Sequence, residues 1–520
     1  MKNSFFRYQE SSALPPLAWC AVVERNNPQI TIQHGPAVEA HPQFFAEAAW
    51  SGNFNLEGLH HATTVCGTAG LQIQEEVLFL TGSSQCSPLF TVRGRDSVYI
   101  SNSMIYALVA AGDQPDSAYP FYAYDILNAY RQRLSDYLSG RNAIGSVVLP
   151  TAKGAELRIH FLARLVLSSD LQFKIQPILV DQPPECYSSL KRHLDETVSA
   201  VLANAAATTR RVQYESFLMI SKGYDSPALA SLAAGKGSDL AATVVDHRQA
   251  DPSADSGIEI ASLLGYQCKT VDRWDYLQQD YKIQAEFAWQ TFAPALSFQS
   301  LATDLNKKIL FSGVYGYAWQ EWQPFRSVER SPYFRTMIAG LGQLEFRLRA
   351  GYLVFAVPSI GIPHTTAWNA ISRSEEMAPW RLGGSYDAPI ARRIGEEAGI
   401  PRQAFGIKKM ATSQVRLFRP GSMSPEALDR YRSFRRFLHS RVPRLMFMFW
   451  RFCHFADSRL WVLLYGTPKR CEFFLKLPWK LTIVSGERQL LPWSYSFMLQ
   501  WSFQEIKDRY LASAPKDYSH

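Results

Sequence analysis

The sequence predicts an α/β protein in which a parallel-sheet domain follows a β-rich α+β domain and precedes a basic, aromatic, mainly helical extension. Residues 217–271 alternate apolar runs with helical segments, which is typical of parallel sheets. Residues 1–185 alternate short apolar runs with Gly, Pro, Ser and Asn, as β-rich domains do. Residues 411–520 are rich in basic and aromatic side chains. We therefore expect three domains, at 1–187, 188–415 and 416–520.

The composition is that of a globular protein with reduced cysteines. A chain of 520 residues is long enough for two or three domains, and an apolar fraction of 47% supports a substantial core. The seven cysteines are scattered, and none forms a Cys-x-x-Cys pair. This pattern predicts a cytoplasmic protein with neither a disulfide framework nor a zinc site. Because residues 1–7 lack a long apolar run, we expect no signal peptide.

The positive charge is concentrated in the C-terminal fifth of the chain. Residues 411–520 hold 18 Lys and Arg against 8 Asp and Glu, a net charge of +10, whereas the whole chain carries +8. The same stretch contains 21 aromatic residues. Basic and aromatic side chains together predict contact with an anionic membrane surface, and no nucleic acid partner is expected. The alternative is that these aromatic side chains pack against the preceding domain.

The first domain is predicted to consist of short strands. Apolar runs at 77–80 and 97–100 stand between turn-forming residues. Cys20 lies inside the apolar run at 17–23, which we expect to form a core strand. Residues 188–206 repeat apolar side chains at helical spacing, so they predict a helix that opens the second domain.

The most informative segment is the run Ser221-Lys222-Gly223-Tyr224-Asp225-Ser226. It lies between an apolar run at 217–220, which predicts a buried strand, and a helical segment at 227–234. Ser226 stands where a helix N-cap belongs, and Pro227 stands at the first helical position.

A tight glycine turn between a strand and a helix predicts an anion-binding site. The backbone N–H groups and the positive end of the helix dipole point toward a ligand above the turn. The hydroxyls of Ser221 and Ser226 and the ammonium of Lys222 add donors. Asp225 can hold a divalent cation that bridges a polyphosphate. The alternative is an ordinary strand–turn–helix connection without a ligand.

The rest of the second domain continues the alternation of strands and helices. Further strands are predicted at 240–245, 268–271 and 307–311, and a helix that Gly265 ends is predicted at 256–264. This order predicts a parallel sheet, whose ligands lie beyond the carboxyl ends of the strands. Asp246 follows one of these strands, and the run Ser312-Gly313-Val314-Tyr315-Gly316 follows another.

Two further segments carry charged side chains. A predicted basic helix ends at Gly399, and a proline turn then leads to Lys408 and Lys409. The alternative for these lysines is a solvated basic turn. Residues 345–349 alternate charged and apolar side chains, which predicts a strand or helix with a buried ion pair.

The run at 221–226 resembles the pyrophosphate loop Ser-Gly-Gly-x-Asp-Ser of the ATP pyrophosphatases, with Lys222 at the second position. Together with residues 386–409, it makes residues 210–410 similar to the asparagine synthetase-like ligases, which are related to the β-lactam synthetases. The resemblance implies a HUP-like synthetase domain that binds ATP and Mg²⁺. It implies roles for these side chains: Ser221, Gly223, Asp225 and Ser226 cradle pyrophosphate, Asp246 borders the adenine pocket, and Lys408 or Lys409 stabilises the reaction intermediate.

The glycine loop after residue 311 departs from the family pattern. Ser312, Gly313 and Gly316 lie where the family carries Ser-Gly-Glu-Gly-x-Asp-Glu, whose acidic residues help to hold magnesium pyrophosphate. Here Tyr317 and Ala318 stand at the two later acidic positions. The loop therefore keeps the glycines and loses the carboxylates, and Glu321 lies close enough in sequence to substitute for them.

Residues 88–108 resemble part of the glutaminase domain of asparagine synthetases, which implies an Ntn-like fold for the first domain. These glutaminases use a cysteine at residue 2, whose own α-amine is the base. In this chain residue 2 is Lys2 and the first cysteine is Cys20. We therefore expect no release of ammonia from glutamine.

The resemblance implies an ATP-dependent amide-forming ligase. Such an enzyme adenylates a carboxylate, and a nitrogen nucleophile then displaces AMP. Free ammonia, a substrate amine or an intramolecular amine would supply the nitrogen. Two alternatives stand beside this one: a non-catalytic nucleotide-binding or scaffold protein, and a protein at the inner membrane face that serves surface-polysaccharide or natural-product assembly.

Overall fold

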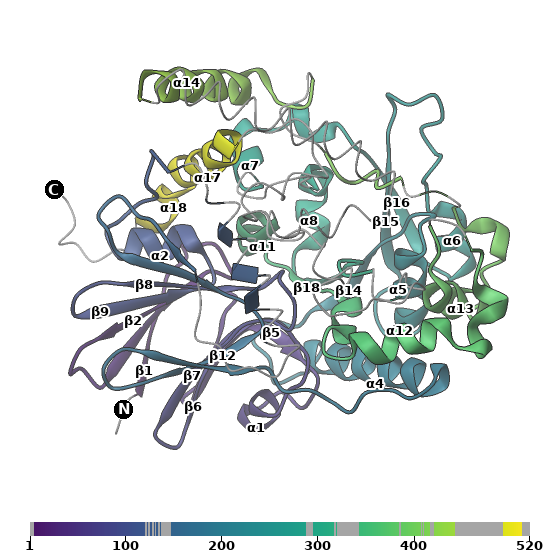
Figure 1. Cartoon of the computed structure of the whole chain (residues 1–520), viewed down its shortest axis with the longest axis horizontal. Coiled ribbons are helices and arrows are strands. Elements are labelled where there is room, and N and C mark those ends of the chain that lie inside the picture. Colours follow the sequence, from purple (N-terminus) through teal and green to yellow (C-terminus); the bar gives the residue numbers. More distant parts are fainter. Residues whose placement is uncertain are drawn as a thin grey trace, which may run out of the picture.

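The computed structural model describes most of the chain. The described residues are 5–119, 147–287, 295–316, 343–383, 386–406, 410–415, 421–441 and 492–511, with Tyr122, Asp125, Ile126, Ala129, Tyr130, Gln132, Arg133, Asp136, Trp319 and Lys408. Within them a β-rich N-terminal part lies beside a parallel α/β part (Figure 1). The fold is therefore mixed α/β, as the sequence predicts.

The N-terminal part contains two sheets. One has the strand order β1-β3-β2-β9-β8-β11-β10, and the other has the order β13-β12-β7-β6-β5-β4. Strands β1 and β3 pair in parallel, and the other neighbours pair antiparallel. The strands are β1 (Phe5–Glu10), β2 (Trp19–Glu24), β3 (Gln29–His34), β4 (Glu39–Ala40), β5 (Phe44–Trp50), β6 (Val65–Ile73), β7 (Glu76–Leu80), β8 (Leu89–Arg93), β9 (Ser97–Ser101), β10 (Val148–Leu149), β11 (Glu156–His160), β12 (Ala163–Leu167) and β13 (Phe173–Pro177).

The two sheets enclose an apolar core. Trp19 of β2 stacks on Phe79 of β7, with ring centroids 6.3 Å apart, and meets Phe45 of β5 edge-on at 4.7 Å. Such contacts between layers are expected where strands alternate inward and outward side chains. Cys20 lies in β2 and is fully buried, so the predicted core strand is confirmed. Two helices, α1 (Leu56–His60) and α2 (Met104–Ala110), accompany these sheets.

The second part is built on a parallel sheet in the order β16-β15-β14-β17-β18. Its strands are β14 (Glu215–Met219), β15 (Leu240–Val245), β16 (Gln267–Asp272), β17 (Lys308–Phe311) and β18 (Leu353–Phe355). The chain order across the sheet is therefore third, second, first, fourth, fifth. The first four strands match the sequence prediction, whereas β18 was not predicted.

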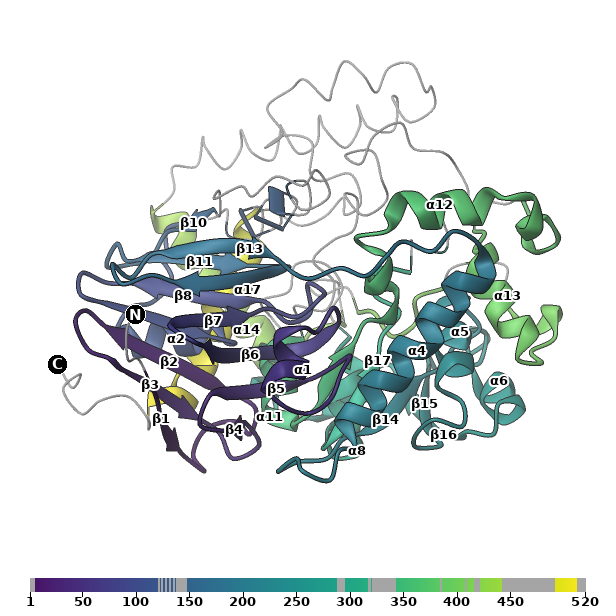
Figure 2. The same ribbon diagram turned by 90° about the horizontal axis from the view of Figure 1, so that it is seen from below.

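Helices cover both faces of this sheet (Figure 2). One face packs on α4 (Tyr187–Ala205), α5 (Asp225–Ala233), α6 (Ile258–Leu263) and α13 (Pro389–Glu397), with α12 (Thr365–Arg373) close by. The other face packs on α7 (Tyr281–Ala285), α8 (Ala302–Leu305), α11 (Leu344–Ala350) and the 3-10 helix η2 (Leu296–Leu301). Successive residues of β14 show the division, because Phe217 faces the second group and Leu218 faces the first.

A buried ion pair joins the two parts. The guanidinium of Arg347, in α11, donates two hydrogen bonds to the carboxylate of Glu47, in β5, at 2.6 and 3.1 Å. Both side chains are almost fully buried. Residues 345–349 therefore supply the buried ion pair that their sequence allows, and it ties the parallel-sheet part to the N-terminal sheets.

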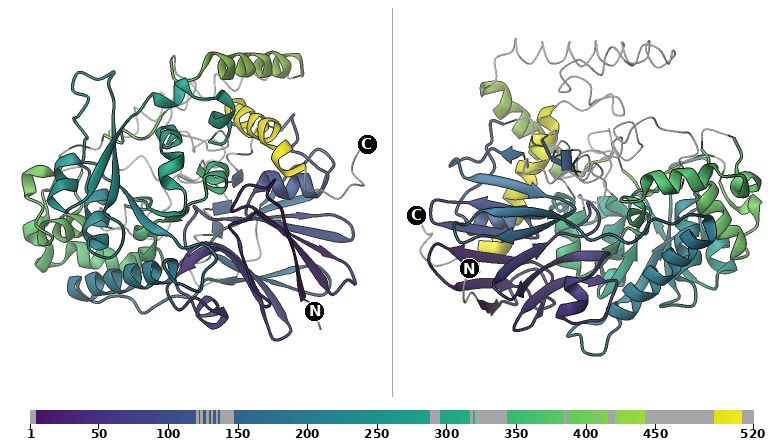
Figure 3. Two further views of the ribbon diagram at one scale, coloured as in Figure 1. Left: turned by 180° about the vertical axis from the view of Figure 1, so that it is seen from behind. Right: turned by 60° about the horizontal axis from the view of Figure 1, so that its bottom comes forward.

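The described part of the C-terminal extension is helical. It consists of α14 (Pro425–Arg441), α17 (Pro492–Ile506) and α18 (Asp508–Leu511), while residues 442–491 lie outside the described residues. Phe497, Trp501 and Tyr510 are buried against the rest of the protein. The packing alternative therefore holds for α17 and α18. Helix α14 lies at the outside of the molecule (Figure 3), but its Tyr431 and Phe434 also pack on Phe497 of α17, with ring centroids 5.1 and 5.0 Å away. Among the described residues, no helix combines the length and the apolar character needed to cross a bilayer.

Candidate functional site at the carboxyl ends of β14 and β17

The strand order reverses direction between β14 and β17, because later strands are added on opposite sides of this pair. In open parallel sheets, ligands bind outside the carboxyl ends of the strands at such a switch point. The run at 221–226 follows β14, and the run at 312–316 follows β17. The two predicted glycine loops therefore meet at the position where this topology favours a ligand.

The first loop is closed by its own hydroxyls. The backbone N–H of Ser221 donates to Ser226 Oγ at 2.9 Å, and the two serine hydroxyls lie 3.1 Å apart. The N–H of Gly223 donates to Ser221 Oγ at 3.2 Å. Since a hydroxyl can both accept and donate, the same groups can turn to donate to an anion.

The helix after this loop begins earlier than predicted. Its first residue is Asp225 and its N-cap is Tyr224, so Ser226 and Pro227 are the second and third helical residues. The predicted N-cap at Ser226 is therefore wrong. The reason is that the Ser226 hydroxyl bonds back to Ser221 O, at 3.3 Å, instead of capping an N–H of its own helix. A helix end differing by one or two residues leaves the turn itself unchanged.

The second loop packs on the Asp225 carboxylate. A methyl group placed on Gly316 would come within 2.3 Å of Asp225 Cγ, and one on Gly313 would come within 3.0 Å of Asp225 Cβ. The N–H of Gly316 donates to Gly313 O at 3.0 Å, which forms the turn. The two glycines are thus required by close approach, and the structure brings Gly313 and Gly316 together with Asp225.

The third segment reaches the first loop from the side. The N–H of Gly406 donates to Lys222 O at 2.7 Å. The Tyr386 hydroxyl lies over the loop, where it accepts a hydrogen bond from the N–H of Tyr224 at 3.4 Å. Lys408, two residues beyond Gly406, is exposed, and Lys409 lies outside the described residues. All three segments singled out in the sequence therefore converge on one edge of the sheet.

Charged groups surround the first loop. Burial raises the pKa of Asp255, and hydrogen bonds from Thr412 and the charge of Lys222 oppose this shift. The Thr412 hydroxyl donates to Asp255 Oδ2 at 2.8 Å, and the N–H of Lys222 donates to Asp255 O at 3.2 Å. Burial also raises the pKa of Tyr386, with the Asp225 carboxylate adding to the shift. Asp255 thus links the first loop to the third segment.

Asp246 has a network of its own. Its carboxylate accepts from Trp274 Nε1 at 2.7 Å, Gln249 Nε2 at 2.9 Å and Arg273 Nη1 at 3.1 Å. Burial would raise the pKa of Asp246, but these hydrogen bonds and the arginine charge hold it below its ordinary value. The carboxylate therefore orders the loops at the ends of β15 and β16, beside the predicted nucleotide loop.

Asp225 is the carboxylate at this edge of the sheet that could take part in holding a magnesium ion. Among the residues that the structure describes, no three His, Cys, Asp or Glu side chains gather to form a complete metal site. Magnesium bound with nucleotides commonly takes one or two protein carboxylates and completes its shell with phosphate oxygens and water. The donor here is one carboxylate, that of Asp225, beside the loop at 221–226 for which the sequence predicts anion binding.

Some residues of the site have no assigned role in the sequence prediction. Tyr386, Asp255, Thr412 and Arg392 all contact or support the first loop; Arg392 lies 4.7 Å above the ring of Tyr224. Asp255 stands directly before the helix predicted at 256–264. This position is the sequence feature that could have indicated a role for Asp255 in the site. The others come from segments whose approach depends on tertiary packing.

The cysteine considered as a nucleophile in the N-terminal part, Cys20, has no exposed thiol. Cys20 is fully buried in β2, and burial raises its pKa. Lys2 lies outside the described residues, as do Tyr317, Ala318 and Glu321.

Comparison of the chain with family models and with curated proteins finds no match.

Proposed function

We propose that this protein binds ATP at the carboxyl ends of β14 and β17 and uses it to form amide bonds. The observation that supports the proposal is the convergence of three segments, at 221–226, 312–316 and 386–412, on one edge of a parallel sheet. The proposal assigns a HUP-like fold to this domain and an Ntn-like fold to the N-terminal part, as members of the asparagine synthetase-like group.

In this proposal the first loop binds the phosphates. The hydroxyls of Ser221 and Ser226 and the N–H of Gly223 turn toward the polyphosphate, and Lys222 adds a positive charge. Magnesium, when bound beside Asp225, neutralises charge on the departing pyrophosphate. The carboxylate of the acid substrate attacks the α-phosphorus to give an acyl adenylate, and an amine then displaces AMP.

A lysine of the third segment stabilises this reaction centre. Lys408 or Lys409 supplies a compact positive charge where the tetrahedral intermediate develops. The hydrogen bond from the N–H of Gly406 to Lys222 O holds the segment that leads to Lys408 against the loop at 221–226, which supports this assignment. The Cys20 thiol is buried in β2, so the proposal does not use it as a nucleophile and has the nitrogen arrive as ammonia or an amine.

The first test is nucleotide binding. Asp225→Asn keeps the shape that packs against Gly316 and removes the charge, so magnesium-dependent binding of ATP should be lost while the fold remains. Isothermal titration calorimetry measures the affinity, and Asp239→Asn, at an exposed carboxylate before the amino end of β15, is the matched control. Equal affinity in Asp225→Asn and the wild type would reject the assignment. Pyrophosphate release across a panel of carboxylates then tests catalysis.

We also propose that the extension contacts anionic lipid at a membrane surface. The observation that favours it is α14, a helix on the outside of the molecule that carries five arginines and two acidic residues. The side chains of Arg430 and Arg432 are 60% and 64% exposed. Phe437 is also exposed, which gives the helix an aromatic side chain beside its charges.

A further inference from the structure

Tyr315 combines an unusual backbone conformation with full burial. Its φ of +71° lies in the left-handed region, which bulky residues rarely adopt. The residue is only 1% exposed and lies between Gly313 and Gly316, in the loop after β17. Since such a conformation persists only where the surroundings enforce it, the contacts of this side chain matter.

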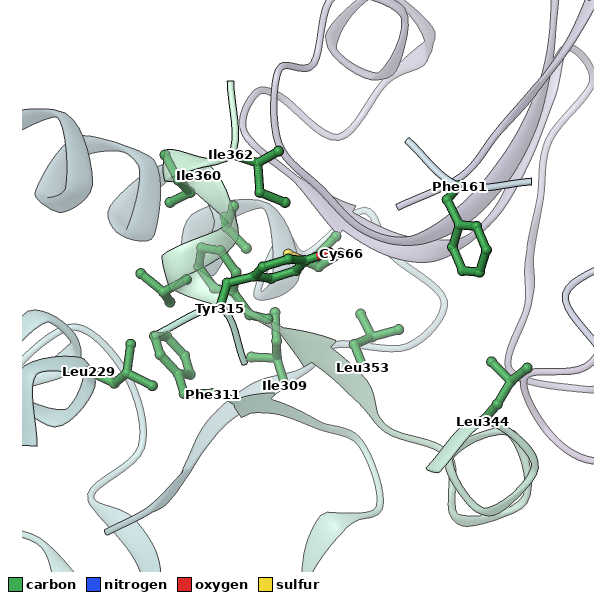
Figure 4. Packing of buried hydrophobic residues seen from close by; sticks show 14 of the residues in the cluster. Cys66, Phe161, Leu229, Ile309, Phe311, Tyr315, Leu344, Leu353, Ile360 and Ile362 are labelled. Atoms are coloured by element: carbon green, nitrogen blue, oxygen red, sulfur yellow. The ribbon is translucent and has the colours of Figure 1, made fainter. Parts of the chain in front are cut away.

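The contacts that hold Tyr315 come from the N-terminal part. Its hydroxyl is hydrogen-bonded to the hydroxyl of Tyr130 and to the backbone of Gln85. Tyr130 and Gln85 are both fully buried. Figure 4 shows the Tyr315 side chain extending to Cys66, which lies on β6 of the N-terminal sheets, amid apolar side chains from both parts. The ring therefore ends at the contact between the two parts, among Gln85, Tyr130 and Cys66, and we call this contact the seam.

The backbone of Tyr315 continues directly into the candidate site. Its neighbour Gly316 is the residue that packs on the Asp225 carboxylate, and the Gly316–Gly313 hydrogen bond closes the turn around Tyr315. A shift of the tyrosine ring would therefore displace the turn, because only one peptide unit separates the two contacts. The anchored side chain of Tyr315 and the packed Gly316 are therefore the two fixed points of one short segment, residues 315–316, which we call the strap.

We propose that Tyr315 is a positioning residue through which the N-terminal part sets the geometry of the nucleotide site. Tyr130 and Gln85 hold the ring, the ring enforces the left-handed backbone, and that backbone lays Gly316 on Asp225. This inference rests on the proposed function for its nucleotide. The inference gives the N-terminal part a role in the reaction, and this role requires no nucleophile in that part.

The experiment compares hydroxyl deletions on the two sides of the seam. In Tyr130→Phe, Tyr315→Phe and the double variant, the affinity for ATP with magnesium is measured by calorimetry on the full chain. Each single variant should weaken binding at least fivefold. The double variant should be no weaker than Tyr315→Phe, since the Tyr130–Tyr315 hydrogen bond is already lost in each single variant. Tyr315→Gly, which accepts the backbone but removes the anchor, should weaken binding at least as much.

Tyr122→Phe is the matched control, because Tyr122 is a buried tyrosine whose hydroxyl donates to Pro150 O and accepts from the N–H of Asp116, two partners within the N-terminal part. It should leave the affinity within twofold of the wild type. Unchanged affinity in Tyr130→Phe and Tyr315→Phe, with a wild type that binds, would overturn the inference. A general loss of affinity that includes Tyr122→Phe would overturn it as well.

A second measurement separates this inference from the proposed function. Hydrogen–deuterium exchange of the peptide containing residues 312–316, without nucleotide, should be faster in Tyr130→Phe than in the wild type and in Tyr122→Phe. If the wild type binds no ATP, the proposed function fails, while the exchange still decides the inference. Equal exchange in all three proteins would then reject the strap.

Discussion

At the scale of single residues, a buried charged side chain limits which substitutions the protein tolerates at that position. The Arg347–Glu47 pair lies between the two parts, and Thr68 also donates to Glu47, at 2.9 Å. Two charges removed from water are stable only as a pair, because each loses its hydration. Loss of either partner would leave the other charge buried without compensation, so the pair constrains the position of α11 against β5.

Arg347→Met tests this pair. The substitution leaves the Glu47 carboxylate buried without its main partner, so it should lower the free energy of unfolding by about 3–5 kcal/mol. Urea denaturation at 25 °C measures the effect. The double variant Arg347→Met/Glu47→Gln, which removes both charges, should recover much of the loss. A single variant within about 0.5 kcal/mol of the wild type would contradict the role given to the pair.

His160 predicts a dependence of stability on pH. Burial lowers its pKa to about 3, and the charges of Arg158 and Arg133 contribute. Below a pH of about 6.5 the unfolded chain binds a proton that the folded ring refuses until the pH reaches about 3, so stability falls as pH falls through this window. The loss from this histidine should approach about 1.4 kcal/mol per pH unit.

His160→Gln should flatten this profile. Urea unfolding at pH 8, where the ring is neutral in both states, reports the cost of the substitution itself, including the 2.9 Å hydrogen bond between the ring and Thr91. The additional loss of stability on going to pH 5 should be smaller in the variant than in the wild type. An identical loss in the two proteins would show that this ring does not govern acid sensitivity.

At the scale of elements, the short helix α18 closes the seam from the C-terminal side. Tyr510 stacks on Tyr106 of α2, with ring centroids 4.7 Å apart, and donates to Glu345 Oε2 at 2.6 Å. Ser103, the N-cap of α2, donates to the other oxygen of Glu345 at 2.6 Å. Burial raises the pKa of Glu345, and these two hydrogen bonds oppose the shift. One carboxylate thus joins α2, α11 and α18.

Tyr510→Phe tests this junction. It keeps the stacked ring and removes one of the two hydroxyl donors to a buried carboxylate, so it should cost about 1–3 kcal/mol of stability. Leu511→Ala is the control in the same helix, because that side chain is 50% exposed and should change stability by less than about 0.5 kcal/mol. Chemical denaturation of the two variants decides the question, and equal stability of Tyr510→Phe and wild type would refute it.

At the scale of the whole molecule, charge separates the extension from the rest. Residues 425–491 contain 13 Lys and Arg against 5 Asp and Glu, a net charge of +8, which equals the net charge of the whole chain. The remaining residues are therefore neutral in sum. An anionic surface would attract the molecule by this one region, and the attraction should weaken with salt over the Debye range.

Co-sedimentation with liposomes tests membrane contact. The protein should pellet with anionic vesicles at low salt and remain in solution with neutral ones. Arg432→Glu/Arg436→Glu, on exposed positions of α14, should reduce pelleting several-fold, whereas Arg25→Glu, at a half-exposed arginine of the N-terminal part, should leave it unchanged. Equal, negligible pelleting with both kinds of vesicle would reject the membrane surface.

The sequence by itself determined the local features of this protein. The alternation of apolar runs and helices indicated the strands β14 to β17, because side-chain periodicity and turn residues act over a few positions. The glycines of the loops at 221–226 and 312–316 could be identified in the sequence as turn residues for the same reason. Strand β18 was missed because its three residues are too few to carry a pattern.

Only the tertiary structure decided which of these features meet. The strand order places the loops after β14 and β17 side by side, although about 90 residues separate them in the chain. It also joins Arg347 to Glu47, and Tyr315 to Tyr130, across the seam. No local pattern encodes these pairs, because they depend on the burial of whole sheets and helices against one another. The positive φ of Tyr315 follows from the same long-range packing, which holds a residue type that would avoid this conformation on its own.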